Sequence, residues 1–436
     1  MRARTWLAGL MLVAGCGRQL NPDYCAAHQD DPDCALEGYK SIDAAPPCMQ
    51  NSDCTKDPAK HVCDTAIGAC VECADNASCP IEKHVCTTGD VCVECVLDTD
   101  CASQLCLAAS GVCADASTIL HASPAGVTSG DCTTTACTLD YAVTQANPTH
   151  HIIELAGGTY HLNATLELGL EGLHLVPEHG QGTPVLTTGS GTVLHVTKSV
   201  ELDGVELSGT NDDIVVSDGP SGKANLVLEQ VSVHGTSRDG INAKNCNVTI
   251  ERSKLFSCQE TAVWVDDGTV NLRNNFIFSN GQNTYQYAAV VFRGSTTGNL
   301  VFNTFGYNTG YDQTFGMGSH QTRIQYPAGL DCDQDNGSTV TATGNLFSEN
   351  QPLAVRYTRC SGDYTSDNLI APNTDAQFKA PPQDLHLTTA TATGPNKVRD
   401  DGNSDCSGDG VDFDGDARPQ NAACDYGADE LASSIP

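Results

Sequence analysis

The chain has 436 residues, a formal net charge of -32 and 23 cysteines. A length of about 150 residues per domain predicts two or three parts. The composition separates them, because seventeen cysteines precede residue 138 while the alternating apolar segments follow it. So acidic a chain lacks the concentrated basic face that a phosphate backbone requires, which excludes nucleic acid as a partner.

The first residues resemble the export signal of a bacterial lipoprotein. A positively charged N-terminus is followed by a short apolar segment and then by LVAGC, a lipobox-like sequence that ends at Cys16. The segment is too short to span a bilayer as a helix, so residues 1–15 are predicted to be a removed signal peptide. The resemblance implies a lipidated Cys16 as membrane anchor. Gly17 replaces the aspartate associated with inner-membrane retention, which favours the outer membrane and the cell surface; an ordinary secretory signal is the alternative.

Residues 16–47 are polar and are predicted to be a tether, in which Cys25 and Cys34 form one candidate pair. Without Cys16, the remaining cysteines are even in number. This parity fits disulfide bonding in an oxidising compartment.

Residues 48–113 contain three groups of four cysteines, each opening with C-x5-C, in a repeat of about 22 residues. Repeats this small cannot bury an adequate apolar core, so two disulfides per module are predicted. Zinc at the C-x2-C steps is the weaker alternative, because these steps straddle the module boundaries. The modules form either a stiff stalk or an array that docks proteins.

A short amphipathic helix is predicted at residues 138–147, ended by Pro148. HIIELAGGTYHL, residues 151–162, follows as a strand, Gly-Gly and Thr-Tyr. This order resembles the opening of right-handed parallel β-helix proteins and predicts a capping helix at the start of such a solenoid.

Six later segments repeat apolar residues at offsets 0, 2 and 7, starting at Val200, Leu226, Val248, Val270, Leu300 and Val340. The offset of 7 keeps one face inward only if a bend separates two short strands, as at Asp203-Gly204. Third strands are predicted at 239–243, 261–265, 287–292, 322–326 and 354–358. Residues 118–390 are therefore predicted to be an all-β, right-handed parallel β-helix, whose coils bury their faces by stacking. A β-sandwich is the alternative, although its sheets need no 22-residue period.

The later cysteines test this register. Cys332 and Cys360 follow the third strands of successive coils and are predicted to pair. Cys246 and Cys258 lie on different corners of one coil, beyond the reach of a disulfide. Either this second pair stays reduced or the register slips there.

The region from about 118 to 390 resembles the pectate-lyase-like superfamily, whose members often bind or cleave acidic polysaccharides along the third-strand face. The residues that follow the inward-facing positions would point outward on that face. The inward-facing positions are Ile241, Val263, Ile324 and Val355. The candidate ligand-binding residues are Arg238, Asp239, Asn242, Trp264, Asp266, Asp267, Arg293, Arg323 and Arg356. A ring beside guanidinium groups suits a sugar acid. The alternative is that these are ordinary solvated side chains on an exposed sheet.

Arg323 and Arg356 are the candidate catalytic residues if the protein is a lyase, with an arginine removing the proton beside a neutralised carboxylate. The sequence contains no tight aspartate cluster of the glycoside hydrolase kind and no clear lyase signature. Catalysis is therefore the minority interpretation.

Calcium is the one cofactor predicted. DCDQDNGS, residues 331–338, is similar to the first half of a calcium loop but lacks the terminal glutamate of an EF-hand. DFDGD, residues 412–416, alternates three further aspartates. The candidate ligands are Asp331, Asp333, Asp335, Asp412, Asp414 and Asp416.

The C-terminal segment, residues 391–436, is predicted to cap the last coil, because an uncovered solenoid end exposes unpaired strand groups. DLHL (384–387), DFDGDARP (412–419) and CDYGADE (424–430) resemble the end region of bacterial surface proteins with a choice-of-anchor Q domain, which follows β-helix repeats. This sequence departs from the pattern at Cys406, for which a bridge to Cys424 is predicted. The resemblance implies surface display and gives no reaction.

The sequence therefore predicts an outer-membrane lipoprotein that displays a β-helix at the cell surface for non-enzymatic binding or adhesion, with carbohydrate as the candidate ligand. One alternative is a polysaccharide lyase or glycoside hydrolase that acts on acidic polysaccharide. Another is a structural envelope protein. The predicted partners are the membrane, through Cys16, and a polysaccharide or a cell-surface protein.

Overall fold

The computed structural model describes residues 48–54, 60–65, 68–87, 90–107, 111–218, 224–281, 288–310, 327–332, 337–351, 368–371, 376–391, 398, 411–418 and 424–431, and the backbone of 312–315 and 322–325. The chain forms two compact units, Met1–Val93 and Glu94–Pro436. Within the described residues, no helix has the length and apolarity needed to cross a membrane. The signal segment, Cys16 and the tether lie outside the described residues, so their predictions are untested.

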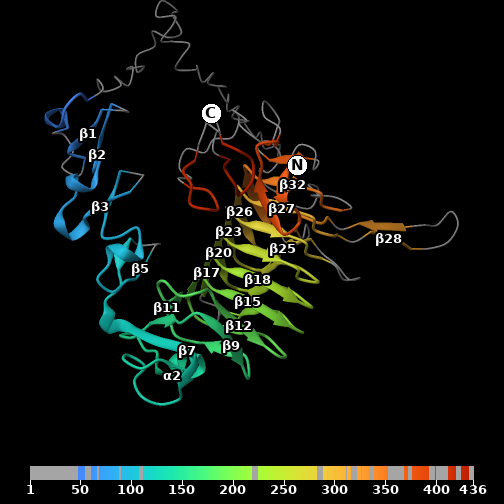
Figure 1. Ribbon diagram of the computed structural model, residues 1–436. Helices are drawn as coiled ribbons and strands as arrows, with labels where there is room; N and C mark the ends of the chain where they lie inside the picture. Colours follow the sequence, from blue (N-terminus) through green and yellow to red (C-terminus); the bar gives the residue numbers. More distant parts are fainter. Residues whose placement is uncertain are drawn as a thin grey trace, which may run out of the picture. The chain divides into compact units, whose positions relative to one another are not determined.

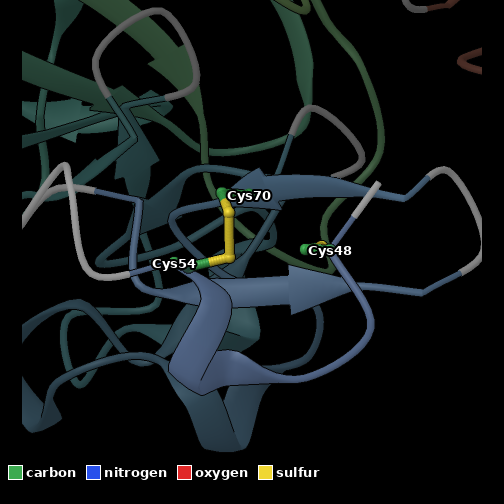
Figure 2. A group of neighbouring side chains, drawn as sticks. All are labelled: Cys48, Cys54 and Cys70. Atoms are coloured by element: carbon green, nitrogen blue, oxygen red, sulfur yellow. A yellow bond between two sulfur atoms is a disulfide. The ribbon is translucent and has the colours of Figure 1, made fainter. Parts of the chain in front are cut away.

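The cysteine modules are held by two disulfides each, as predicted. The first cysteine pairs with the third and the second with the fourth: Cys48–Cys63, Cys54–Cys70, Cys73–Cys86, Cys79–Cys92, Cys95–Cys106 and Cys101–Cys113. Figure 2 shows the Cys54–Cys70 bridge with Cys48 beside it. A sulfur in a disulfide is no longer a thiolate ligand, so the zinc alternative for these cysteines is wrong.

Each module combines one 3-10 turn with one two-stranded hairpin. The turns are η1 (Asn51–Asp53), η2 (Asn76–Ser78) and η4 (Asp98–Asp100), with a further turn η3 at Ile81–Lys83. The hairpins pair β1 (Val62–Asp64) with β2 (Ala69–Val71), β3 (Val85–Cys86) with β4 (Cys92–Val93), and β5 (Cys106–Leu107) with β6 (Val112–Cys113).

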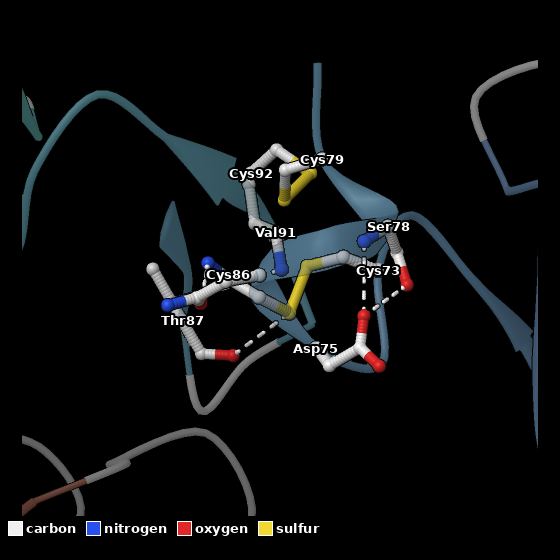
Figure 3. Close-up of a disulfide and its surroundings, with 9 residues drawn as sticks. Cys73, Asp75, Ser78, Cys79, Cys86, Thr87, Val91 and Cys92 are labelled. Atoms are coloured by element: carbon white, nitrogen blue, oxygen red, sulfur yellow. Dashed lines mark hydrogen bonds between the residues drawn. A yellow bond between two sulfur atoms is a disulfide. The ribbon is translucent and has the colours of Figure 1, made fainter. Parts of the chain in front are cut away.

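Polar side chains replace a core inside these modules. The side chain three residues after the first cysteine accepts the backbone N–H of the third: Asn51 from Cys63 at 2.9 Å, Asn76 from Cys86 at 2.8 Å and Asp98 from Cys106 at 2.9 Å. In the second module, Asp75 also accepts from the backbone and hydroxyl of Ser78, beside the Cys73–Cys86 bridge (Figure 3). Each disulfide closes a loop of 11 to 16 residues and contributes about 3 kcal/mol, which a core this small could not supply.

The strands described between residues 119 and 371 form a solenoid of three parallel sheets, apart from one inserted hairpin, which confirms the predicted fold class (Figure 1). The first sheet contains β7 (Ile119–Val127), β8 (Ile152–Leu155), β11 (Leu173–Pro177), β14 (Val200–Asp203), β17 (Asn225–Glu229), β20 (Asn247–Glu251), β23 (Thr269–Arg273), β26 (Thr297–Val301) and β31 (Thr339–Thr343). The 3-10 turn η5 (Ala116–Thr118) precedes it.

The second and third sheets complete each coil. The second contains β9 (Gly158–Leu162), β12 (Pro184–Thr188), β15 (Glu206–Thr210), β18 (Ser232–Thr236), β21 (Lys254–Phe256), β24 (Phe276–Phe278), β27 (Thr304–Gly306), β32 (Leu346–Ser348) and β33 (Leu369–Ala371). The third contains β10 (Leu166–Leu168), β13 (Leu194–Val196), β16 (Val215–Asp218), β19 (Ile241–Lys244), β22 (Val263–Asp266), β25 (Val290–Arg293) and β30 (Leu330–Cys332).

Helix α2 (Leu139–Gln145) covers the N-terminal end of the solenoid, as predicted (Figure 1). Its Leu139 and Ala142 are buried in the same apolar cluster as Leu120 of β7. The disulfide Cys132–Cys137, which the sequence analysis did not predict, closes the loop before the helix. The helix therefore shields the first inward-facing layer from water.

The predicted inward register is correct for the first four segments, since Val200, Leu226, Val248 and Val270 stand opposite one another. The alignment at Leu300 is wrong by two residues, because Val270 faces Gly298 and Gly298 faces Val340. A Cβ atom on Gly298 would lie 2.4 Å from the Phe292 ring. The ring of Phe292 therefore occupies the space that an apolar side chain at position 298 would fill. Because glycine stands at this position, the apolar repeat is not visible there in the sequence.

A left-handed residue forms the predicted bend between the first and second sheets in successive coils. These residues are Gly204, Gln230, Arg252, Asn274, Phe302 and Gly344, with φ between 46° and 68°. One such residue reverses the inward and outward alternation between two short strands, which explains the apolar offset of 7.

Two stacks of buried asparagines run along the coils. In one, each Nδ2 donates to the Oδ1 of the next coil, through Asn275, Asn303, Asn345 and Asn368 at 2.7–2.9 Å. The second joins Asn280, Asn308 and Asn350 at 2.9–3.0 Å. Each Oδ1 also accepts a backbone N–H from the preceding coil, as Asn303 does from Asn275. The asparagines thus satisfy buried donors at the bends that no strand partner reaches.

The third cysteine module belongs to the unit of the solenoid. Its Leu105 is buried with Ile119, Ile152 and Val176 on the outer side of the first sheet. Asp98 of the same module lies 3.2 Å from Nδ1 of His179. This module therefore covers apolar side chains that would otherwise face water.

Residues 376–391 and the C-terminal segment pack together along the side of the solenoid in their described parts. β34 (Phe378–Ala380) and β35 (Asp384–Leu387) form an antiparallel pair, and their apolar residues cluster with Phe276 of β24 and Leu346 of β32. The N–H of Ala428 donates to Thr304 Oγ1 at 2.9 Å. This packing covers apolar residues on the outer faces of several coils. That residues 391–436 cap the last coil stays a prediction.

Arg418 holds the two final loops together. Its fully buried guanidinium lies 3.2 Å from the fully buried Glu430 carboxylate and donates to the carbonyls of Asp425 and Gly427. It also stacks over the Phe302 ring at 4.5 Å. Removing one partner of such a pair leaves a buried charge, at a cost of about 3–5 kcal/mol.

The remaining cysteines agree with the register. Cys246 and Cys258 are buried thiols that form no disulfide, so the first of the two alternatives for this pair is correct. Cys332 and Cys424 are both disulfide-bonded. Their predicted partners, Cys360 and Cys406, lie outside the described residues, so those pairings stay predictions.

We predict that Asn303→Ala destabilises the protein by about 3 kcal/mol or more, because it leaves buried donors and acceptors on two neighbouring coils without partners. Denaturant unfolding followed by circular dichroism would measure the loss. Asn299→Ala in the same coil is the matched control, since Asn299 is exposed on β26. Equal effects of the two substitutions would contradict the assigned role.

Candidate binding face on the third sheet

The outer face of the third sheet brings part of the predicted ligand-binding set together. Asn242 stands opposite Trp264, as predicted, and Trp264 stands opposite Val291 in the next coil. Asn242 and Trp264 are half-buried, whereas Val291 and the following Asp331 are fully buried. The accessible part of this row therefore ends at Trp264.

Arg323 does not lie on this face, and its predicted place there is wrong. It belongs to β29 (Thr322–Gln325), which pairs antiparallel with β28 (Asp312–Phe315) in an inserted hairpin. Figure 1 shows β28 extending away from the stacked strands. The hairpin is inserted before the third strand of that coil. This strand is Leu330–Cys332 and not the predicted 322–326. Arg356 and residues 354–358 lie outside the described residues.

Arg238 joins three carboxylates from the two coils that flank its own. Its guanidinium lies 3.0 Å from Asp212, 3.7 Å from Asp213 and 3.9 Å from Glu260. Sequence reasoning found Arg238 and Asp239 but missed these three acids, because coils of unequal length hide the alignment. Asp213 could have been found from its position in the repeat. Asp213 and Asp239 both lie two residues before a third-sheet strand.

Asp213 and Asp239 use their carboxylates to join coils. Oδ1 of Asp213 accepts the N–H of Asp239 at 3.1 Å, and Oδ1 of Asp239 accepts the N–H of Thr261 at 3.0 Å. Nδ2 of Asn242 donates to Asp213 at 3.1 Å and to Asp239 at 3.4 Å. Both aspartates are only 5% exposed. They are therefore mainly part of the scaffold beneath the face.

Burial governs the protonation of this group. It raises the pKa of Asp239 to about 7 and also raises the pKa of Asp213 and of Glu260. The Asp213 carboxylate raises the pKa of the Arg238 guanidinium. Near neutral pH, a share of the Asp239 carboxyls carries a proton, which lessens repulsion among the acids.

Trp264 and Arg293 form the other end of the accessible face. The guanidinium of Arg293 lies 5.2 Å from the Trp264 ring centroid and 3.6 Å from the buried Asp331 carboxylate. Asp266 stands opposite Arg293 in the register. Arg293 therefore holds the indole ring in position through a cation–π contact. Asp267 lies beside this group and accepts the N–H of Ser295 at 2.7 Å.

His195 extends the face toward the N-terminal coils. Its two ring nitrogens each lie 2.6 Å from a carboxylate, one from Glu167 and the other from Asp218. Partial burial lowers its pKa, but the hydrogen bonds with Asp218 and Glu167 raise it overall. The imidazole links three neighbouring coils on the exposed surface.

The face as a whole is acidic. Its acids are Glu167, Asp212, Asp213, Asp218, Asp239, Glu260 and Asp266, and its bases are Arg238, Lys244 and Arg293. The arginine that we expected from the next coil is in the hairpin. A row of guanidinium groups for a sugar acid is therefore absent from the described part of the face.

The aspartates predicted to bind calcium do not act together in the described residues. Asp331 pairs with Arg293, while Asp333 and Asp335 are not described. Asp412 is fully buried and its carboxylate accepts the N–H groups of Asp414, Asp416 and Glu430 at 2.8–2.9 Å. Asp412 therefore shapes a turn, and the DFDGD segment does not present three free carboxylates to one ion.

A cavity lies at the N-terminal end of the solenoid. It has a volume of about 480 Å³ and is lined by Tyr141, Tyr160 and His161 among others. By contrast, the third-sheet face is built from strand side chains on successive coils. Its geometry suits a chain molecule lying across the strands better than a small enclosed ligand.

Comparison with known proteins agrees with this architecture. Residues 198–380 match the family described as "Right handed beta helix region". Among solved structures, pectate lyase Pel9A is similar with a TM-score of 0.37 and 11% identity, over 72% of this chain and 96% of that chain. That likeness is too distant to carry the lyase's activity to this chain. No curated protein sequence matches this chain. The fold class is a right-handed parallel β-helix preceded by disulfide modules.

We predict that Asp239→Asn flattens the pH dependence of stability. The pKa of Asp239 is raised from 3.8 to about 7, so its stabilising contribution is full below pH 3.8 and is lost as the pH rises through about 7. The lost contribution is at most about 4 kcal/mol. Melting temperatures from pH 4 to pH 8 should therefore fall less in Asp239→Asn than in the wild type. The matched control is Asp212→Asn, at a partly exposed neighbour, and equal slopes for all three proteins would refute the assignment.

Proposed function

We propose that this protein is a lipoprotein of the bacterial outer membrane that displays its β-helix at the cell surface and binds carbohydrate without turning it over. The binding surface is the outer face of the third sheet between His195 and Trp264. The observation that carries the proposal is the register that places Asn242 beside Trp264, whose ring Arg293 holds.

Trp264 supplies the main contact in this proposal. A half-buried indole ring covers the apolar face of a sugar, and a neighbouring amide bonds to its hydroxyls. Because Arg293 packs on Trp264, the ring is ordered before a ligand arrives, which lowers the entropic cost of binding. The same row continues through Val216 and His195 on the preceding coils, so an extended glycan would contact several coils at once.

The charge of the face favours neutral or amino sugars. Arg238 is already paired with three carboxylates and Arg293 with Asp331. A uronate would bring further negative charge to an acidic surface and would find these guanidinium groups engaged. Acidic polysaccharide is therefore a poorer ligand than the sequence analysis expected.

Burial of the two aligned aspartates favours binding over catalysis. Asp213 and Asp239 are 5% exposed and each bonds to a backbone N–H of the next coil. A general acid or base has to reach the scissile bond within hydrogen-bond distance. Carboxylates held beneath the face do not meet that requirement.

We predict that Trp264→Ala lowers glycan affinity at least about tenfold, since the ring contact contributes about 1.4 kcal/mol or more. Trp264→Phe should keep most of the affinity because it retains a ring. A glycan array with neutral, amino and uronic oligosaccharides would identify the ligand, and titration would measure the change. Tyr141→Ala, on the distant cap helix, is the control.

The same experiment separates binding from turnover. Chromatography of the bound oligosaccharide after incubation should recover it intact, and ultraviolet absorbance should detect no unsaturated uronate. Release of cleaved products that is lost in Asp239→Asn would replace the proposal with a hydrolase. Strongest binding to uronic oligosaccharides would overturn the assignment to neutral or amino sugars.

We predict that Cys16→Ser moves the protein from the membrane to the soluble fraction, because the acyl chains are lost. Gly17→Asp should keep the anchor but retain the protein in the inner membrane. Membrane fractionation and surface protease treatment of cells would measure both changes. Membrane association that survives Cys16→Ser would contradict the lipid anchor.

A further inference from the structure

Three segments of the C-terminal region converge on one histidine. His386 lies on β35, Asp414 in the turn that Asp412 shapes, and Asp429 in the last described loop. One ligand atom from each, the imidazole nitrogen and two carboxylate oxygens, lies within 4.8 Å of the others. These residues come from the three sequence motifs that mark this region, yet the sequence separates them by 28 and 15 residues (414 − 386 and 429 − 414).

The histidine is held with one nitrogen free for a ligand. Asp384 bonds to Nδ1 of His386 and also accepts its backbone N–H at 3.1 Å. The rings of Phe276 and Phe413 lie edge-on at 4.9 and 5.6 Å from the imidazole. A carboxylate on Nδ1 and apolar walls fix the orientation of the ring, as around histidine ligands of metals.

The second nitrogen is buried and lacks a hydrogen bond. Nε2 of His386 has no partner in hydrogen-bond geometry, although Asp414 Oδ2 lies 3.1 Å from it. Buried polar atoms of side chains are satisfied in most native structures, so such an atom calls for an explanation. A cation between Nε2 and the two carboxylates would satisfy it.

The carboxylates leave room for that cation. Asp429 uses Oδ2 to accept the N–H of Leu387 at 2.6 Å, and Asp414 is half-exposed at the mouth of the group. The opening at Asp414 gives an ion a path from solvent.

We propose that His386, Asp414 and Asp429 bind one divalent transition-metal ion, with zinc as the best fit. One imidazole and two carboxylates suit zinc, with a solvent molecule as the fourth ligand of a tetrahedral site. Calcium fits less well, because it takes six to eight oxygen ligands and disfavours imidazole. The ion would join β35 to both terminal loops and so fasten the C-terminal segment to the side of the solenoid.

The first test uses the full chain, with disulfides intact and metal removed by EDTA. Isothermal titration with Zn²⁺ should show one ion per chain, and the melting temperature should rise by about 3 °C or more at saturation. Co²⁺ should give the visible absorption of a tetrahedral site with nitrogen and oxygen ligands. Ca²⁺ should give a smaller shift or none.

Two variants and one control locate the ion. His386→Asn and Asp414→Asn should both abolish the cobalt spectrum and the zinc-dependent shift, and half-exposed Asp414 can be replaced without disturbing the fold. His195→Asn is the matched control, because His195 also lies between two carboxylates but has both nitrogens engaged. It should keep the full response.

Three results would contradict the proposal. A protonated His386 paired with Asp414 would explain their contact without a metal, and then neither Zn²⁺ nor Co²⁺ would bind at one per chain. Unchanged cobalt absorption in Asp414→Asn would place the ion elsewhere. A stabilisation by Ca²⁺ equal to that by Zn²⁺, without tetrahedral cobalt bands, would also overturn it. None of these readouts depends on carbohydrate binding.

Discussion

The structure depends on one constraint, which is that each coil turns from its first sheet to its second through a residue in left-handed conformation. Gly204, Gln230 and Asn274 share this position in three different coils. Because this one residue reverses the alternation, the apolar positions of the next strand again point inward. Donors left unpaired at the bends are then met by buried asparagines, whose amides stack from coil to coil. Side chains thus complete the hydrogen bonding that strands alone cannot provide.

A solenoid built in this way has apolar residues on its outer faces that other segments cover. The third cysteine module covers Ile119 and Ile152 on the first sheet, and the C-terminal segment covers Phe276 on the second. The third sheet keeps half-buried Asn242 and Trp264 at its surface. The described attachments thus lie on the first and second sheets, and the face that we propose for binding lies on the third. The buried Arg418–Glu430 pair shows how firmly one attachment is made, since breaking such a pair costs more than most surface contacts contribute.

The chemical character of the third-sheet face follows from where the insertions fall. The hairpin of β28 and β29 removes Arg323 from the row, while the unequal early coils bring Asp212 and Glu260 to Arg238. A face expected to be rich in free guanidinium groups is instead acidic, with its arginines already paired. For the carbohydrate binding that we propose, this acidic charge favours neutral or amino sugars over uronates. The buried aspartates hold coils together.

The sequence by itself determined the fold class, the capping helix, the paired cysteines of each module and the facing of Asn242 and Trp264. Each of these follows from local periodicity, and the 22-residue spacing from Leu226 to Val270 is uninterrupted. Only the tertiary structure decided the alignment at Gly298, the position of Arg323 and the meeting of His386 with Asp414 and Asp429. In each case the physical reason lies outside the local sequence pattern. A large ring can fill a neighbour's space, an insertion can delay a strand, and side chains far apart in sequence meet only when loops fold back on a completed surface.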